Sequence, residues 1–223
     1  MLMSSLPSPD ALFLAKRPPL SRLKLDRRLR VLRPAHARAL RLTERVLHWG
    51  AIPLGMTDAE VVARAKTALR EIENETVHLI IRDRLEIRTC ISALRRRLGG
   101  EPAPAPGSVW GFGRWTRHIE RNWSEAGFRL DGVFPWLREA DKLLKDRDTL
   151  ALQRLILEQA WRSANRRRGQ HQYDFEAVVV YVVKWNIVDR WARYDGEAAA
   201  VRFEELTEAA LGDYGKIFEE GRA

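Results

Sequence analysis

The chain has 223 residues, 45% of them apolar and 31% charged, which is the balance of a folded globular protein and excludes a disordered one. Its formal net charge of +9 lies in the first half, because residues 1–100 hold 20 Lys and Arg against 10 Asp and Glu, whereas residues 101–223 hold 19 against 20. The single cysteine, Cys90, excludes an internal disulfide, and no apolar run approaches the ~20 residues of a membrane-spanning helix. We therefore expect a cytoplasmic protein, peripheral to a membrane at most, whose basic half meets nucleic acid, an anionic membrane surface or an acidic protein.

Two helices are predicted near the start of the chain. Ser21 precedes the amphipathic stretch "RLKLDRRLRVL", and Pro34 opens a second stretch, "AHARALRLTERVLHW", which Gly50 closes. Both stretches are rich in arginine, so we expect two basic helices here.

A single very long helix is predicted over about 58–98. "TDAE" at 57–60 has the spacing of a capping box, and "GG" at 99–100 supplies the stop. Apolar residues between them recur every three or four positions, and a continuous helix of about 40 residues would be about 60 Å long. Asp83 interrupts the apolar stripe, which predicts a kink or a buried polar contact at that position.

The stretch "GGEPAPAPGS", 99–108, is typical of a stiff linker because it is rich in proline and glycine. We therefore expect an N-terminal basic helical lobe over 1–98, a linker over 99–109 and a C-terminal helical lobe over 110–223. Further helical patterns cover about 136–145, 149–168, 174–194 and 198–220. Alternation typical of a strand is absent apart from a possible extended start at "MLMSSL", so the predicted fold class is all-α.

The most apolar stretch, "DFEAVVVYVVKWNIVDRW", predicts a central helix. Its valine-rich run is too short to span a membrane, and its apolar residues continue at helical spacing from Val178 to Trp191. Asp174 is placed to cap the start and Gly196 to end the helix. The β-branched valines oppose a helix by only a few tenths of a kcal/mol each. Trp161, Trp185 and Trp191 fall on apolar stripes and are expected in the core.

The residue types that carry chemistry do not assemble into a recognisable site. No two histidines have metal-ligand spacing and Cys90 has no partner cysteine, which predicts neither a metal site nor a bound cofactor. "GFG" at 111–113 is not preceded by a strand and is better explained as a turn, and no nucleophile elbow is present. The sequence therefore predicts a protein that is not an enzyme. The histidines considered are His36, His48, His78, His118 and His171.

Two arginine runs and two tryptophans are the candidate contacts for a partner. Each run sits at a predicted helix C-terminus, where it either interacts with the helix dipole or binds an acidic partner or phosphates. The two tryptophans flank glycines just past the linker, where partial exposure would make them available for docking. The candidates are Arg95, Arg96, Arg97, Trp110, Trp115, Arg166, Arg167 and Arg168.

Several segments together resemble one bacterial family. They are "LMSSLP" followed by "RPPLS", "RDRLEIRTCISALRRRLGGE", "FPWLREADKLLKDRDTLALQRLILEQAWR" and "YDFEAVVVYVVKWNIVDRWARYDGEAAAVRFEEL". The chain is similar to a family of unknown function encoded with V-type (A/V-type) ATPase subunits. That family in turn resembles the all-helical C/d subunit of these ATPases, which forms the collar between the rotor's central shaft and the membrane proteolipid ring. Family members begin with a tyrosine-rich lead-in before "SLP", whereas this chain begins with "ML".

The resemblance implies a non-catalytic helical subunit or accessory factor of a bacterial V-type ATPase. Its partners would be the central shaft and the proteolipid ring, without a small-molecule substrate, and it would reach the membrane only through them. An alternative hypothesis is a basic helical nucleic-acid-binding protein, which strong, sequence-independent and salt-sensitive DNA binding would indicate. A third is a helical enzyme whose site is assembled from scattered carboxylates.

Overall fold

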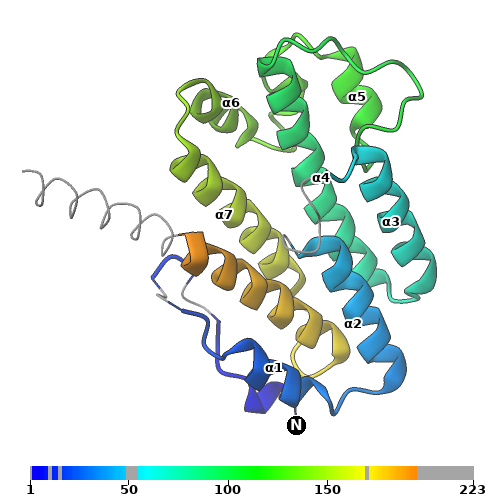
Figure 1. The fold of residues 1–223 in the computed structure, drawn as a ribbon, viewed down its shortest axis with the longest axis vertical. Helices are drawn as coiled ribbons and strands as arrows, with labels where there is room; N and C mark the ends of the chain where they lie inside the picture. The colour runs from blue at the N-terminus through cyan, green and yellow to red at the C-terminus, as the bar shows by residue number, and fades with distance from the viewer. Residues whose placement is uncertain (1, 10–11, 15–16, 49–54, 169–170, 195–223) are drawn as a thin grey trace, which may run out of the picture.

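The computed structural model describes residues 2–9, 12–14, 17–48, 55–168 and 171–194, and within these ranges the regular structure is entirely helical (Figure 1). The predicted all-α class is confirmed. The elements are η1 (Met3–Ser5), α1 (Arg22–Leu29), α2 (Pro34–Leu47), α3 (Asp58–Glu71), α4 (Glu75–Leu98), α5 (Thr116–Arg121), η3 (Ala126–Arg129), α6 (Leu137–Lys145), α7 (Thr149–Arg168) and a helix over 175–194. The helix predicted over 198–220 and the stop at Gly196 lie outside the described residues.

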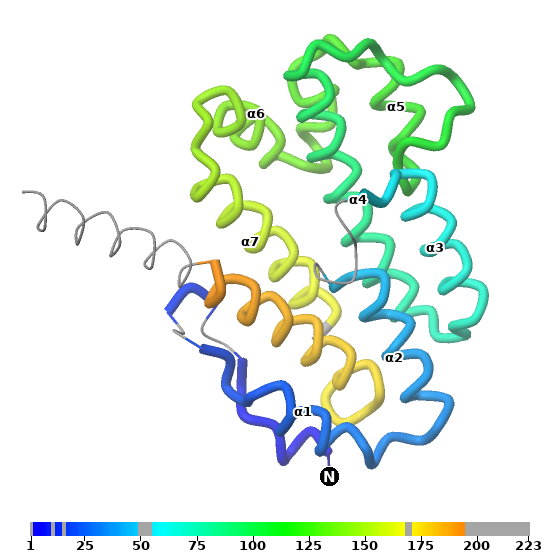
Figure 2. The backbone as a smooth tube through the Cα atoms, in the orientation of Figure 1, coloured from blue at the N-terminus to red at the C-terminus, as the bar shows by residue number. Residues whose placement is uncertain are grey.

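Helices α4 and α7 lie side by side through the middle of the molecule (Figure 1). Helices α2 and α3 lie on one side of α4, while α5 and α6 gather at the end where α4 terminates. The helix over 175–194 crosses the other end, and the chain before α1 runs beside it (Figure 2). The indole Nε1 of Trp185 donates a hydrogen bond of 2.8 Å to the Leu20 carbonyl, so segments 165 positions apart in sequence are joined there.

The buried apolar side chains form two clusters, and both draw on α4 and α7. The first cluster contains Ile81 of α4, Leu157 of α7 and most of the helix over 175–194. The second contains Leu94 of α4 and Leu152 of α7, together with residues of α5 and α6. The clusters therefore separate across α4 and α7, not at 99–109, where the sequence predicted the boundary between two lobes.

The prediction of one helix over 58–98 is wrong, because the chain leaves the helical conformation between α3 and α4. Ile72 is extended (φ −97°, ψ 119°), and the side chain of Asn74 caps α4 by accepting a hydrogen bond of 3.0 Å from the Val77 amide. Ile72 is nevertheless buried, so its side chain keeps the apolar periodicity although its backbone is not helical. The 24 residues of α4 give a length of about 36 Å at 1.5 Å per residue.

The sequence predicted a kink or a buried polar contact at Asp83, and the structure shows a partly buried polar contact. Its Oδ2 accepts hydrogen bonds from Ser163 Oγ at 2.9 Å and from an Arg167 guanidinium nitrogen at 3.0 Å. Both donors lie on α7, so the carboxylate joins the two central helices. Helix α4 continues through Asp83 without a break.

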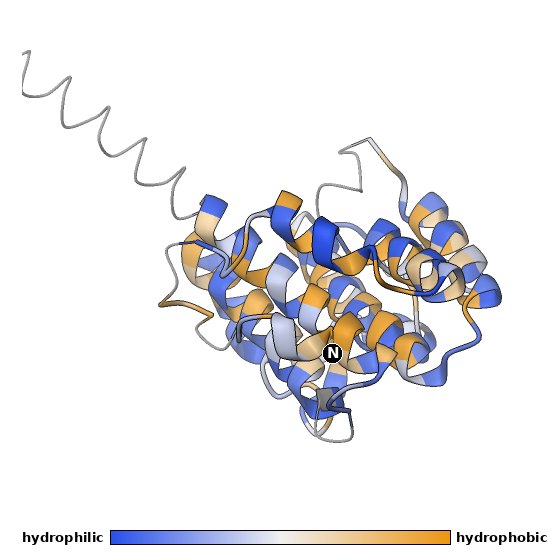
Figure 3. Ribbon diagram, turned by 90° about the horizontal axis from the view of Figure 1, so that it is seen from below, coloured by the Kyte–Doolittle hydropathy of each residue, from blue (hydrophilic) through white to orange (hydrophobic). Residues whose placement is uncertain are grey.

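The helix over 175–194 is the central helix that the sequence predicted. Asp174 Oδ1 accepts a hydrogen bond of 2.9 Å from the Ala177 amide, which confirms the expected cap. Every side chain from 177 to 188 is buried, as expected for a helix covered on all sides. Figure 3, seen from the α1 end, shows apolar and polar residues alternating around the surrounding helices.

Candidate functional site

Arg97, a predicted partner contact, is used inside the molecule. Its guanidinium donates hydrogen bonds to the carbonyls of Trp123 (3.1 Å) and Glu125 (2.7 Å) and forms an ion pair of 2.9 Å with Asp141 on α6. It also lies over the Phe128 ring, 4.6 Å from the centroid. These contacts hold the loop before α6 against the end of α4.

The other two residues of the first arginine run differ in exposure. Arg96 forms ion pairs with Asp58 at 3.2 Å and Glu101 at 3.7 Å, so its charge is also compensated within the chain. Arg95 is exposed. The run does occupy the last turn of α4, where cations interact favourably with the helix dipole.

The second arginine run ends α7, as predicted, and is only partly available to a partner. Arg167 pairs with Asp83, while the Arg166 side chain is 65% exposed and its guanidinium lies 3.9 Å from the same carboxylate. The side chain of Arg168 lies outside the described part of the structure.

The expectation that Trp110 is partly exposed is wrong. It is 3% exposed in the second cluster, where its Nε1 donates a hydrogen bond of 2.8 Å to Glu120 and its ring meets Trp123 edge-on. Trp115 is half-buried beneath the guanidinium of Arg114, 5.1 Å from the ring centroid. Trp115 is thus partly exposed, as the sequence predicted, whereas Trp110 is not.

Glycines 111 and 113 explain why Trp110 is buried. The Thr89 hydroxyl on α4 accepts from the Phe112 amide at 2.8 Å and donates to the Phe112 carbonyl at 3.0 Å, which fixes the loop against the helix. A Cβ at Gly111 would lie 2.5 Å from Thr89 Cγ2, and one at Gly113 would lie 2.5 Å from Glu86 Cγ. Gly113 also has φ +109°, a conformation that favours glycine. "GFG" is therefore a close-approach turn.

Uncompensated positive charge lies instead on α1, α2 and the turn between them. Five arginines there have exposed side chains, and within the described ranges none of them forms an ion pair. We call them the basic α1–α2 surface: Arg27, Arg30, Arg33, Arg41 and Arg45. The sequence did not single them out, because Asp26 and Glu44 lie four and three positions from Arg30 and Arg41, and only the structure shows that both carboxylates pair with Arg22 instead.

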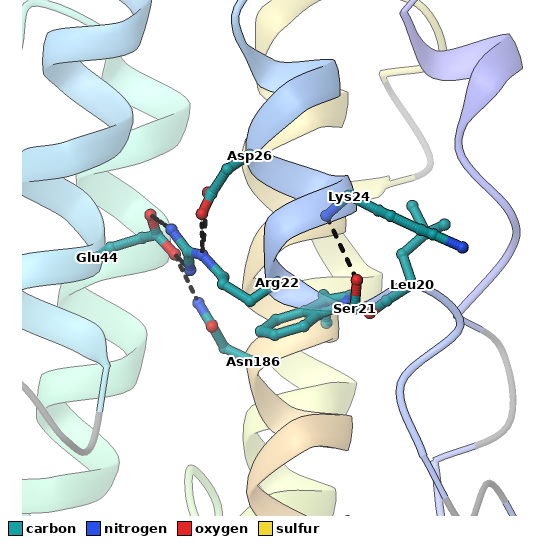
Figure 4. A network of polar contacts seen from close by, with 8 residues as sticks. Leu20, Ser21, Arg22, Lys24, Asp26, Glu44 and Asn186 are labelled. Atoms are coloured by element: carbon teal, nitrogen blue, oxygen red, sulfur yellow. Dashed lines mark hydrogen bonds and ion pairs between the residues drawn. The ribbon is translucent and has the colours of Figure 1, made fainter.

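A polar network fixes this surface to the core (Figure 4). Arg22 on α1 donates to both carboxylate oxygens of Glu44 on α2, at 2.6 and 3.0 Å, and its Nε donates to Asp26. Asn186, from the central helix, donates to the same Glu44 at 3.2 Å. The hydrogen bonds that Arg22 donates to Glu44 and Asp26 raise the pKa of Arg22 above its ordinary value. Three helices are thus joined through one guanidinium.

One group has the geometry of a possible metal site. His171, Asp174 and Glu176 each offer a ligand atom, and these atoms lie within 4.8 Å of one another. All three already hold protein partners: His171 bonds to Asp174 at 2.6 Å, Asp174 caps the central helix, and Glu176 accepts from Asn74 at 2.6 Å. The arrangement is explained as a helix cap that fastens the central helix to α4.

Cys90 is buried in the second cluster. Burial raises the pKa of its thiol to about 12, with a further contribution from Glu86. A thiol in this state is almost entirely protonated at neutral pH and is a poor nucleophile.

Comparison of the chain with protein-family models, curated proteins and solved structures finds no match. Within the described residues, no helix combines the length and the apolar character needed to cross a bilayer.

Proposed function

We propose that this chain is a non-catalytic helical subunit or accessory factor of a bacterial V-type ATPase. In this role it couples the central shaft to the membrane ring or assists assembly, and it reaches the membrane only through its partners. The proposal is supported by the resemblance of its segments to a family encoded with such ATPases and by its all-helical fold, which suits a spacer between two partners.

The observation that carries the proposal is the basic α1–α2 surface. Its five guanidinium groups have no ion-pair partner within the described ranges, and the Arg22 network holds the helices beneath them in place. Complementary charge accelerates association and selects partners, so an acidic protein surface is the docking partner that this arrangement fits. The arginine runs at 95–97 and 166–168 fit this role less well, since Arg96, Arg97 and Arg167 already pair with acidic residues.

The test is a pull-down of the tagged protein from gently solubilised native membranes, with partners identified by mass spectrometry. Wild type is expected to recover head, shaft and ring subunits of the ATPase. The double variant Arg41→Glu/Arg45→Glu, which reverses two exposed charges one turn apart on α2, is expected to lose at least tenfold of that recovery.

The matched control is Arg117→Glu/Arg121→Glu, which makes the same change at two exposed arginines one turn apart on α5, at the other end of the molecule. It should recover partners like wild type. Equal recovery by both double variants would exclude the basic α1–α2 surface as the docking site. An ATPase that purifies without this chain would refute the ATPase role itself.

The same surface is the specific observation that favours the alternative, nucleic-acid binding. Phosphate contacts by about five arginines would give a salt slope (log K against log[salt]) of about −4.5 on duplex DNA. Fluorescence anisotropy with a labelled duplex measures this slope. Submicromolar affinity with that slope at physiological salt, lost in Arg41→Glu/Arg45→Glu, would favour nucleic acid over an acidic protein.

A further inference from the structure

An open groove between α2 and α3 adjoins the basic α1–α2 surface. It has a volume of about 340 Å³. Arg45 belongs to both features, because it is one of the five exposed arginines of that surface and also lines the groove. One partner can therefore contact the arginines and the groove at the same time.

The walls of the groove come from one face of each helix. Helix α2 contributes Leu42 and Val46, which are one turn apart, and α3 contributes Thr67 and Glu71 at the same spacing. The two helices run in opposite directions, because Arg38 in the first half of α2 pairs with Glu71 at the end of α3. A groove between two helices packed in this way has the shape that accepts a further helix.

The floor of the groove is apolar. Val46 and Ala68 are each 3% exposed, and Leu42 beside them is half-buried. An apolar side chain that packs there is removed from water, which favours binding in proportion to the area buried. Phosphates gain nothing from such a floor, so it favours a partner with an apolar stripe over nucleic acid.

Arginines follow one edge of α2 at helical spacing. Arg38, Arg41 and Arg45 lie three and four positions apart, and all three are exposed. Arg38 forms an ion pair of 2.6 Å with Glu71 of the neighbouring α3, whereas Arg41 and Arg45 form none within the described ranges. Carboxylates one turn apart on a further helix would pair with these two as Glu71 pairs with Arg38.

We propose that the groove and the adjoining arginines bind an acidic amphipathic α-helix of the partner. The apolar stripe of this helix lies on Val46 and Ala68, and its carboxylates meet Arg41 and Arg45. The inference rests on the proposed docking of an acidic protein and names the form in which that protein presents its charge. Exposed ion pairs contribute little by themselves, so the apolar stripe supplies most of the affinity and the carboxylates orient the helix.

The test is fluorescence anisotropy of the full chain with two labelled synthetic peptides of equal composition, at physiological salt. In the first peptide leucines lie on one face of a helix and glutamates flank them one turn apart. In the second the same residues are permuted so that no face is apolar. The first peptide is expected to bind at least tenfold more tightly. Equal affinities, or no binding of either peptide, would overturn the proposal.

Thr67→Trp fills the groove without changing any charge. Because Thr67 is exposed, the variant is expected to keep the wild-type circular dichroism and melting temperature and to bind the helical peptide at least tenfold more weakly. Ala63→Trp places the same side chain at an exposed position of α3 outside the described lining, and it should bind like wild type. Unchanged affinity in a folded Thr67→Trp would contradict the assignment.

The charges are tested with the two double variants introduced above. Arg41→Glu/Arg45→Glu should weaken the helical peptide at least tenfold, and Arg117→Glu/Arg121→Glu should not. A labelled DNA duplex provides the competing result. If the duplex bound more tightly than the helical peptide, and Thr67→Trp left its affinity unchanged, the surface would belong to nucleic acid and the proposal would be wrong.

The pull-down separates this inference from the function on which it rests. If Arg41→Glu/Arg45→Glu loses the ATPase subunits while the two peptides bind equally, the acidic partner remains and its helical form is wrong. If the helical peptide binds in the groove but wild type recovers no ATPase subunits, the binding site remains and the ATPase role is wrong.

Discussion

Single side chains in this protein often perform two tasks at once. Trp185 fills the first cluster at 2% exposure, and its indole nitrogen also donates to the Leu20 carbonyl. Arg97 likewise pairs with Asp141 while holding two loop carbonyls. Substitutions at such positions are expected to lower the free energy of unfolding by more than the lost buried area alone would, because a buried polar group loses its partner as well.

At the residue scale, Trp185→Ala is expected to lower the free energy of unfolding by about 3–5 kcal/mol, as large-to-small changes in a core do. Chemical denaturation followed by circular dichroism measures the loss. Trp185→Phe, which keeps an aromatic ring but loses the hydrogen bond, should cost less. A loss below about 1 kcal/mol for the alanine variant would mean that the ring is not core.

Pairs of elements are joined by carboxylates at partly buried positions. Asp83 connects α4 to α7, and Asp141 connects α6 to α4. Burial alone would raise the pKa of Asp141, but hydrogen bonds from Lys145 and Arg97 outweigh it and hold the pKa below its ordinary value. The ionised carboxylate is therefore bound more favourably in the folded chain than in the unfolded one.

At the element scale, this shift predicts a pH-dependent contribution to stability. Because the folded pKa is depressed, the contribution is fully present above the ordinary carboxyl value of about 3.9 and is lost as the pH falls through the folded pKa. Asp141→Asn should cost about 1.5–3 kcal/mol at pH 7, and the difference from wild type should shrink towards zero well below pH 4.

Urea unfolding at a series of pH values measures this difference. Asp146→Asn makes the same change at an exposed carboxyl just past the end of α6 and should cost little at any pH. If the cost of Asp141→Asn stayed constant down to the lowest pH, the ionised Asp141 carboxylate would not be the source of the stability, and the prediction would be wrong.

On the scale of the whole molecule, the sequence predicted most helices but misjudged how they join. Helices with their own caps and apolar stripes, such as α7 and the helix over 175–194, were predicted within a residue or two. The break at Ile72 was missed because its side chain stays on the apolar stripe while Asn74 caps the next helix. The apolar spacing is the same for one continuous helix and for two helices with a break at Ile72, so the spacing alone does not decide between them.

The sites were harder to predict than the helices. The burial of Trp110 depends on Gly111 and Gly113 letting the loop approach α4, a contact between residues more than 20 positions apart. The groove beside Arg45 requires α2 and α3 to pack side by side. Neither contact has a signature at short range in the sequence, whereas the charge excess of the first hundred residues did indicate a basic surface.

The two clusters share α4 and α7, so the described residues are expected to unfold as one cooperative unit. Ile81→Ala in the first cluster and Leu94→Ala in the second should each cost about 2–5 kcal/mol. Both should move the same single calorimetric transition, with equal calorimetric and van't Hoff enthalpies. Two resolved transitions, each sensitive to only one of the substitutions, would show that the clusters unfold independently.

The position of the central helix late in the chain also affects how the protein is made. When residue 98 has been synthesised, α4 already carries apolar residues for both clusters, but its partner α7 and the helix over 175–194 do not yet exist. At about 5–20 residues per second, the ribosome needs on the order of 5–20 s to add them. During this interval we expect the nascent chain to expose the apolar sides of α2, α3 and α4, and we therefore expect chaperones that bind emerging chains to cover them.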